Sequence, residues 1–264
     1  MICFVIAFPA EAMPILQHYG FKTFKPGPFP IYKSEIGFLV ISGMGKKSAA
    51  KAVSHLAELC PENAIWMNVG IGGHQNAEIG AAFLAHKVVD LETGKNWYPQ
   101  ILFSAKCKSG TVFTVEKCET QYGEDGIYDM EASGFYEEAA RFSTAELIHS
   151  FKIISDNAAS PGAKVSPKIG EALIEKKMKT LDQIANELIV IQKELPTNEP
   201  ELMKEFLERW HFTVTQQHQL RKKLLKLQTL DPKSSFLSKV KKCINSRQAL
   251  AALEVYLEAL PIYL

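Results

Sequence analysis

The stretch Tyr128–Ser133, which reads Tyr-Asp-Met-Glu-Ala-Ser, is followed along the chain by Ile153–Asn157, which reads Ile-Ile-Ser-Asp-Asn. Glu131 lies between an apolar run and a helical pattern, so we expect it at the junction of a strand and a helix. Asp156 closes a second apolar run. Because ligands of open α/β sheets gather at the carboxyl ends of strands, both acids are candidates for one site. Each acid alone has a structural alternative, as a residue that favours the start of a helix.

Short apolar runs alternate with helical patterns through the first part of the chain. The predicted strands are residues 2–7, 37–42, 64–70, 83–90, 110–115 and 150–155, and the predicted helices are residues 10–19, 46–59 and 131–142. Alternation of this kind predicts an α/β fold in which helices flank a layered central sheet.

The pattern changes after Ala158–Gly162, where long helical patterns replace the strand signals. One helix is expected over residues 167–194, and a proline-marked break follows at Pro196–Pro200. We therefore predict two parts, an α/β domain of residues 1–195 and a helical C-terminal extension of residues 196–264.

The composition fits a soluble globular protein, since 22% of the 264 residues are charged and 47% are hydrophobic. No apolar run approaches the roughly 20 residues that span a bilayer, which argues against a membrane protein. Met1–Ala7 is apolar but lacks a basic leader and is too short for a signal peptide, so it is expected to be a buried first strand. A cytoplasmic protein is the natural expectation.

The chain has five cysteines, namely Cys3, Cys60, Cys107, Cys118 and Cys243. Their odd number and the absence of Cys-x-x-Cys spacing argue against a zinc site and against a disulfide framework. Cys107 and Cys118 flank a predicted strand, so a reactive pair is the alternative to free thiols in a reducing compartment.

Four segments occur in an order that carries a family resemblance. They are Ala7–Ala12 after the first strand, Ser42–Lys46 at the start of a helix, Asn68–Gly73 after another strand, and the acid pair. This ordered set resembles the superfamily of nucleoside phosphorylases and nucleosidases, most closely the methylthioadenosine and S-adenosylhomocysteine nucleosidases. The resemblance implies a layered, mixed central sheet flanked by helices. It also implies a homodimer, a small-molecule purine nucleoside as substrate, and no metal or organic cofactor.

Hydrolysis of an N-glycosidic bond builds positive charge on the ribose and negative charge on the departing base. By the resemblance, Glu131 accepts hydrogen bonds from the ribose 2′- and 3′-hydroxyls while Met130 packs under the sugar. Asp156, with Ser155 beside it, is implied to be the general acid that protonates N7 of a purine. The two acids would thus act on opposite ends of the same bond.

The resemblance also implies residues that contact the base and the sugar. Phe113 lies where the family places an aromatic that stacks on the base, although a buried position on a strand is an equal alternative. Gly70 and Gly72 would allow close approach of the backbone, although a turn after a strand also favours glycine. Ile71 stands where a small hydroxyl residue is usual in the family. The loop Gly43–Lys46 has amides that could face an anion or water.

The choice between a hydrolase and a phosphorylase depends on cations for a phosphate nucleophile. Phosphorylases of the superfamily carry arginines in the first loop and before the glycine-rich segment, but no arginine precedes Arg141 here. A hydrolase instead uses an acid in the first loop to activate water. Ungapped alignment places Ala12 at that position and Glu11 one residue earlier, so Glu11 is either the base or an acid that stabilises the helix start.

The favoured hypothesis is an N-glycosidase that hydrolyses a purine or 5′-modified nucleoside, with Asp156 and Glu11 as catalytic residues. The first alternative is a phosphorylase that holds phosphate with backbone amides and lysines such as Lys46. The second is an inactive nucleoside-binding protein, motivated by Ala12.

The extension contains a basic helical pattern at Thr213–Leu227, with leucines at one face and lysines between them. Residues 161–264 carry 17 Lys and Arg against 12 Asp and Glu, a net charge of +5, whereas residues 1–160 carry 13 against 17, a net charge of −4. A packed helix with a solvated basic face is expected, and nucleic-acid binding is disfavoured because no base-reading motif is present.

Overall fold

The computed structural model of the chain describes residues 1–61, 63–117, 122–160, 165–195, 200–232, 236, 240 and 243–260. The chain divides into two compact units, Met1–Leu195 (unit 1) and Pro196–Leu264 (unit 2). Cys118 and most of the expected break at Pro196–Pro200 lie outside the described residues. The other four cysteines are free thiols.

Unit 1 is built on one mixed sheet. Its strands are β1 (Ile2–Ile6), β2 (Lys22–Lys25), β3 (Ile31–Ser34), β4 (Gly37–Ile41), β5 (Ile65–His74), β6 (Ala82–Asp90), β7 (Asn96–Trp97), β8 (Lys108–Thr114), β9 (Ile127–Asp129) and β10 (Ile148–Asn157). The strand order is β10-β6-β8-β9-β5-β1-β4-β3-β2, with β7 paired to β6. β5 also pairs with β10, so β5, β10, β6, β8 and β9 pair in a closed circuit.

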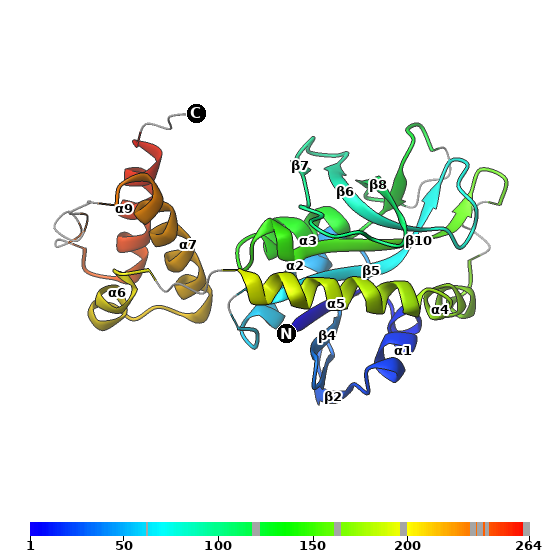
Figure 1. Ribbon diagram of the computed structural model, residues 1–264, viewed down its shortest axis with the longest axis horizontal. Helices are drawn as coiled ribbons and strands as arrows, with labels where there is room; N and C mark the ends of the chain where they lie inside the picture. Colours follow the sequence, from blue (N-terminus) through cyan, green and yellow to red (C-terminus); the bar gives the residue numbers. More distant parts are fainter. Residues whose placement is uncertain are drawn as a thin grey trace. The chain divides into compact units, whose positions relative to one another are not determined.

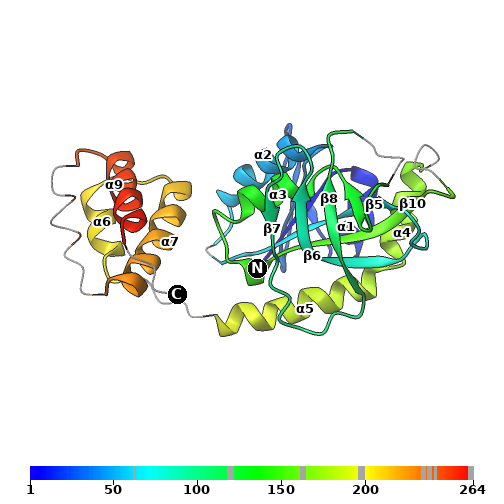
Figure 2. The ribbon, with the colours of Figure 1, turned by 90° about the horizontal axis from the view of Figure 1, so that it is seen from above.

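Helices cover both faces of this sheet (Figures 1 and 2). They are α1 (Pro9–His18), α2 (Lys46–Ala57), α3 (Ala132–Ala139), the 3-10 helix η1 (Ala145–Leu147), α4 (Pro167–Glu175) and α5 (Met178–Glu194). Apolar residues of α2 and α3 share one core cluster, and those of α1, α4 and α5 share a second. β1 supplies both clusters in alternation, with Val5 in the first and Phe4 in the second, as expected for a strand between two layers.

Unit 1 differs from the sequence prediction in several places. The antiparallel hairpin of β2 and β3 was not predicted, because every residue of β2 is exposed and no apolar alternation marks it. The single helix expected over residues 167–194 is two helices that are separated at Lys176 and Lys177. Both helices contact α1 and β5, but α4 packs mainly against α1 and also reaches β10, whereas α5 also contacts η1.

The glycine-rich segment was expected to follow a strand, but it is part of one. β5 continues through Gly72 and Gly73 to His74 and pairs there with β9 and β10. A Cβ built on Gly72 would lie 2.7 Å from a methyl group of Ile127 and 2.8 Å from the carbonyl oxygen of Tyr128. Glycine is therefore needed here so that β9 can approach β5 closely.

Unit 2 is helical in the residues that the structure describes, with α6 (Met203–Arg209), α7 (Val214–Leu230) and α9 (Ser246–Glu258). Thr213 and Gln216 form a capping box at the start of α7. The leucines of the basic helix, Leu220, Leu224 and Leu227, are buried against Phe206, Phe236 and Leu253 in a core of its own. None of the described helices in either unit combines the length and the apolar composition that crossing a bilayer requires.

Replacing Gly134 of α3 by alanine is expected to destabilise unit 1. A Cβ built on Gly134 would overlap the backbone carbonyl of Lys46, at the first residue of α2, so the two helices would have to separate. We expect a loss of roughly 1 to 3 kcal/mol or more in the free energy of unfolding, measured by urea denaturation. Gly123→Ala is the control, because no atom lies within 4 Å of a Cβ built there. Equal stability of the two variants would contradict this packing.

Candidate active site

A cavity of about 230 Å³ opens in unit 1 at the carboxyl ends of several strands. It is lined by Phe8, Glu11, Met44, Ile71, Gly72, Gly73, Val115, Tyr128, Asp129, Met130, Glu131, Ser155, Asp156 and Val165. These residues come from the segments that follow β1, β4, β8 and β9, from β5, β9 and β10 themselves, and from the residues before α4. The location agrees with the general position of ligand sites in α/β sheets.

Most of the site residues predicted from the sequence meet in this cavity. Those that line it are Glu11, Ile71, Gly72, Met130, Glu131, Ser155 and Asp156. Gly70 and Phe113 are absent from the lining formed by the described residues. Asp129, which by the resemblance stands in for a glutamate that lines the base and sugar side, also lines the cavity. Tyr128 and Val115 line it without having been assigned a role from the sequence.

Glu131 is held by the loop that leads into α2. The backbone N–H of Gly45 donates to Glu131 Oε1 at 2.8 Å, and Gly45 has φ of 98°, in the left-handed region that favours glycine. The predicted anion-facing loop thus binds a carboxylate of the protein itself. Burial raises the pKa of Glu131, the Lys152 ammonium opposes this, and Asp129 adds to it, with a net upward shift.

Glu11 is buried, with 4% of its surface exposed, and its Oε2 atom has no hydrogen-bond partner among the described residues. Burial raises its pKa from 4.5 to about 8. The Lys152 ammonium lowers this pKa, Glu131 raises it, and the N–H of Ile71 lowers it, but burial dominates. Glu11 therefore keeps its proton in much of the unliganded protein at neutral pH.

Lys152, on β10, is the central charge beneath the cavity, and its side chain is 1% exposed. Its Nζ lies 2.8 Å from Asp129 Oδ2. Burial alone would lower the pKa of Lys152, but Asp129, Glu131 and Glu11 together raise it above its ordinary value. Lys152 is thus a buried ammonium that three carboxyl groups surround.

Asp129 is fully engaged in holding this arrangement. Its Oδ1 accepts from Thr114 Oγ1 at 2.8 Å, and its Oδ2 accepts from the N–H of Ala132 at 2.9 Å, at the start of α3. Asp129 therefore fixes Lys152 from one side and the helix that follows Glu131 from the other. These partners satisfy both carboxylate oxygens, so Asp129 can be buried.

Gly70 acts on these charges although it is outside the cavity lining. It lies directly opposite Lys152 in the pairing of β5 with β10. A Cβ built on Gly70 would lie 3.2 Å from Glu11 Oε2 and 3.5 Å from Lys152 Nζ. The missing side chain at Gly70 leaves space that both the Glu11 carboxyl and the Lys152 ammonium border.

Asp156 and Ser155 both line the cavity because the strand is irregular at this point. Neighbouring residues of a regular strand face opposite sides of the sheet, but the pairing of β10 with β5 shifts register between Ile154 and Asp156. Ser155 Oγ donates to Asp156 Oδ1 at 2.5 Å. The hydroxyl of Tyr122 donates to Asp156 Oδ2. Both carboxylate oxygens of Asp156 thus have a donor from the protein.

Phe113 does not have the position expected for an aromatic that stacks on a base. Its ring packs against Tyr128, with 5.4 Å between ring centroids, and Tyr128 in turn packs against Tyr122 at 5.3 Å. Phe113 is 8% exposed and belongs to a small aromatic cluster behind the cavity. The alternative of a buried strand residue describes it better, and Tyr128 is the aromatic of this cluster that lines the cavity.

Lys46 also differs from one of its expected roles. Its Nζ lies 2.8 Å from Asp90 Oδ2 and 2.6 Å from Glu92 Oε2. Asp90 is further held by Ser133 Oγ at 2.9 Å. Lys46 thus ties the start of α2 to the end of β6, and none of the described residues that line the cavity is a lysine or an arginine.

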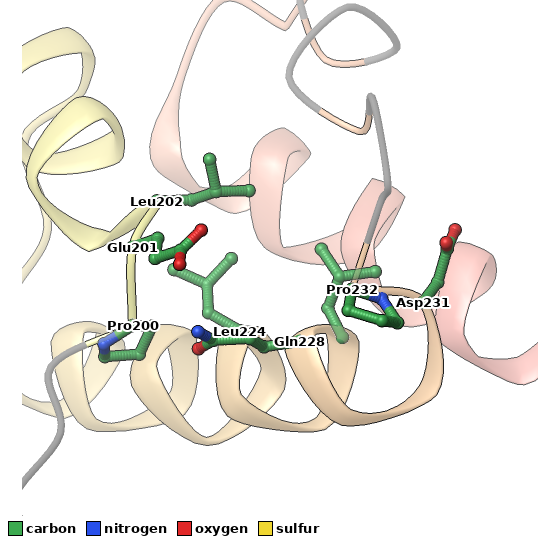
Figure 3. A pocket seen from close by; sticks show the side chains of 8 residues that line it. Pro200, Glu201, Leu202, Leu224, Gln228, Asp231 and Pro232 are labelled. Atoms are coloured by element: carbon green, nitrogen blue, oxygen red, sulfur yellow. The ribbon is translucent and has the colours of Figure 1, made fainter.

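Unit 2 has a smaller cavity of about 60 Å³ (Figure 3). It is lined by Pro200, Glu201, Leu202, Leu224, Leu227, Gln228, Asp231 and Pro232. This volume corresponds to about two water molecules. In neither unit do three His, Cys, Asp or Glu side chains of the described residues gather so as to hold a metal ion.

No protein-family model matches the sequence, and a search of curated proteins gives no match either. Solved structures do match. The 5′-methylthioadenosine/S-adenosylhomocysteine nucleosidase of Helicobacter pylori is 17% identical, with a TM-score of 0.56, over 70% of this chain and 97% of its own. Futalosine hydrolase of Helicobacter pylori is 16% identical, with a TM-score of 0.55, over 70% of this chain and 97% of its own. The 5′-methylthioadenosine nucleosidase of Arabidopsis thaliana is 17% identical, with a TM-score of 0.54, over 74% of this chain and 96% of its own.

At these identities the likeness establishes the fold. The chain has the α/β fold of these nucleosidases, which confirms the predicted fold class and the structural resemblance to the superfamily. The predicted homodimer stays a prediction.

Removing the charge of Lys152 is expected to destabilise unit 1 strongly. Lys152→Met would leave Asp129 buried without its ion-pair partner, and such losses cost about 3 to 5 kcal/mol of the free energy of unfolding. Lys95→Met is the control, because the exposed pair of Lys95 with Glu137 should contribute less than about 1 kcal/mol. The double variant Lys152→Met with Asp129→Asn should recover part of the loss. Urea denaturation at pH 7 measures the free energy of unfolding of each variant. Similar losses in Lys152→Met and Lys95→Met would contradict the role of Lys152 as a buried ion-pair partner of Asp129.

The raised pKa of Glu11 predicts how stability changes with pH. Since the folded-state pKa of about 8 exceeds the ordinary 4.5, the stabilising contribution is complete below about pH 4.5 and is lost as the pH rises towards 8. Glu11→Gln removes this dependence. We therefore expect the free energy of unfolding of the variant, relative to the wild type, to rise by a few kcal/mol between pH 5 and pH 8. A constant difference across that range would show that Glu11 titrates normally.

Proposed function

We propose that unit 1 is an N-glycosidase that hydrolyses the bond between the base and the ribose of a purine or 5′-modified nucleoside. The observation that carries this proposal is the position of Asp156 and Glu131 in one cavity, each held by its own set of donors. Cleavage of this bond needs a proton donor at the base and hydrogen-bond acceptors at the sugar. The fold shared with known nucleosidases supports the same activity.

Asp156 is proposed to act on the base. A purine leaves more readily when N7 accepts a proton, because protonation neutralises the negative charge that develops on the ring. Gly73 lies between Asp156 and Tyr128 in the register of β10, β5 and β9. A base beside Asp156 would therefore rest on the backbone at Gly73 and next to the ring of Tyr128, which suits a flat aromatic ligand.

Glu131 is proposed to bind the ribose hydroxyls. Its Oε1 accepts from Gly45, which leaves Oε2 and the remaining lone pairs for the sugar. Hydrogen bonds from hydroxyls to a carboxylate are stronger than neutral ones and strengthen as positive charge develops on the ring. Met130 lines the same wall and offers an apolar surface for the sugar.

Glu11 is proposed to activate the water nucleophile. Its unpartnered Oε2 faces the space left open at Gly70. The deprotonated form of Glu11 is the general base, and its share grows as the pH rises towards the pKa of about 8. Glu11 would accept a proton from water as the oxygen attacks the anomeric carbon. Ala12, which aligns with the family's glutamate, is instead fully buried in the core.

Water is favoured over phosphate as the nucleophile. A phosphate nucleophile needs cationic partners, but none of the described lining residues is a lysine or an arginine. Lys46 is paired with Asp90 and Glu92, and Lys152 is paired with Asp129. The negative charge of Glu131 would also oppose phosphate.

A panel of adenosine, inosine, methylthioadenosine, S-adenosylhomocysteine and futalosine tests the proposal through base release in the absence of phosphate. Asp156→Asn and Glu131→Gln are each expected to lower kcat/KM by roughly 10²- to 10⁴-fold. Asp182→Asn and Glu137→Gln are matched controls, because both acids lie outside the cavity, and their activity should equal that of the wild type.

Three outcomes separate the candidates. Base release without phosphate, together with loss of activity in both site variants, supports the hydrolase. Strict dependence on phosphate would establish a phosphorylase. Binding of a nucleoside without base release by the wild type would establish a binding protein, and unaltered activity of Asp156→Asn and Glu131→Gln would refute the assigned site.

A further inference from the structure

Tyr122 contacts the proposed acid from outside the cavity. Its hydroxyl donates to Asp156 Oδ2, yet Tyr122 is only 5% exposed and is not among the residues that line the cavity. Its ring packs against Tyr128, which packs against Phe113. The aromatic cluster thus holds the hydroxyl of Tyr122 in place behind Asp156.

The backbone at Gly73 makes this contact possible. A Cβ built on Gly73 would overlap the hydroxyl of Tyr122, so the ring of Tyr122 lies directly against the strand at the point where Gly73 faces Asp156 in the register. A side chain at this position would therefore exclude Tyr122, which is a reason for glycine that is separate from its place in the cavity lining. Glycine admits the tyrosine that reaches Asp156.

Tyr122 and Ser155 together limit how the Asp156 carboxyl can turn. A carboxyl group has two oxygens with about four lone-pair positions in total. Tyr122 takes one position on Oδ2, and Ser155 takes one on Oδ1. A group held by donors on both oxygens has one preferred plane, and its remaining positions are the ones available to a ligand in the cavity.

We propose that Tyr122 is a positioning residue for the departure of the base, which orients the Asp156 carboxyl so that it can protonate the leaving group. Tyr122 does not touch the substrate and transfers no proton itself. In the step that it serves, the proton on Asp156 passes to the base nitrogen, the electrons of the glycosidic bond pass to the base, and Asp156 is left as a carboxylate. This inference rests on the proposed N-glycosidase activity.

Tyr122→Phe tests the inference because it removes only the hydroxyl. With a purine nucleoside that the wild type cleaves, kcat should fall roughly 10- to 100-fold, as expected for the loss of one hydrogen bond to a charged group, while KM changes little. The same assay with the N7-methylated analogue of that nucleoside provides the second readout. Its base already carries the positive charge that protonation would supply, so Tyr122→Phe should cleave it at nearly the wild-type rate.

The matched control is Tyr19→Phe. Tyr19 also donates to a carboxylate, Asp182 Oδ1 at 3.1 Å, but far from the cavity lining, so this variant should behave as the wild type with both substrates. Gly73→Ala is the second variant, because the added methyl group would displace the hydroxyl of Tyr122. Gly73→Ala should show the same loss with the unmethylated nucleoside and nearly the wild-type rate with the N7-methylated one. Loss with both substrates would instead indicate obstruction of the cavity at Gly73.

The outcomes distinguish this inference from the proposed function. Equal losses with both substrates would indicate a general structural role and would overturn the inference. Unchanged kcat of Tyr122→Phe, when Asp156→Asn is impaired, would overturn it while leaving the proposed function intact. Absence of base release by the wild type would overturn both.

Discussion

The buried ammonium of Lys152 is the constraint on which the arrangement of the cavity depends. A lysine that is 1% exposed cannot stay charged without partners, and Asp129, Glu131 and Glu11 supply them from three different segments. β10 therefore cannot take its place unless β9, the start of α3 and the start of α1 converge on the same point. The electrostatic requirement of one side chain thus brings together elements that are distant in the sequence.

The carboxyl groups near Lys152 differ in how many hydrogen-bond and ion-pair partners they have. Asp129 has a direct ion pair and hydrogen bonds on both oxygens, whereas Glu11 has an unpartnered oxygen and a pKa raised by burial to about 8. Burial, together with an Oε2 atom that lacks a hydrogen-bond donor among the described residues, favours the protonated form of Glu11. A group that holds a proton weakly near neutral pH is suited to exchange it with water, which links the charge balance to the proposed chemistry.

Strand ends and local patterns were enough to predict the sheet, the helices beside it and the shared location of Glu131 and Asp156. Lys152 was missed although a lysine inside an apolar strand signals a buried acid partner, since no local pattern identifies that partner. Tyr122 was missed because it belongs to a polar segment with no periodicity. The sequence left two alternatives for Phe113, and strand register and the approach of Tyr128 decide that Tyr128 lines the cavity while Phe113 packs behind it. Such features depend on contacts between distant segments, which sequence spacing does not encode.

The position of Glu11 shows how a carboxylate can face the cavity from a residue other than the aligned one. α1 begins at Pro9, and each residue of a helix rotates the side chain by about 100°, so the residue at which the helix starts decides which side chain faces the cavity. Here Glu11 faces the cavity and Ala12 packs into the core with Ile15. Gly70 opposite Lys152 then provides the space that the Glu11 carboxyl needs. The helix start and a glycine on β5 together place an acid at the cavity from a residue one position before the aligned one.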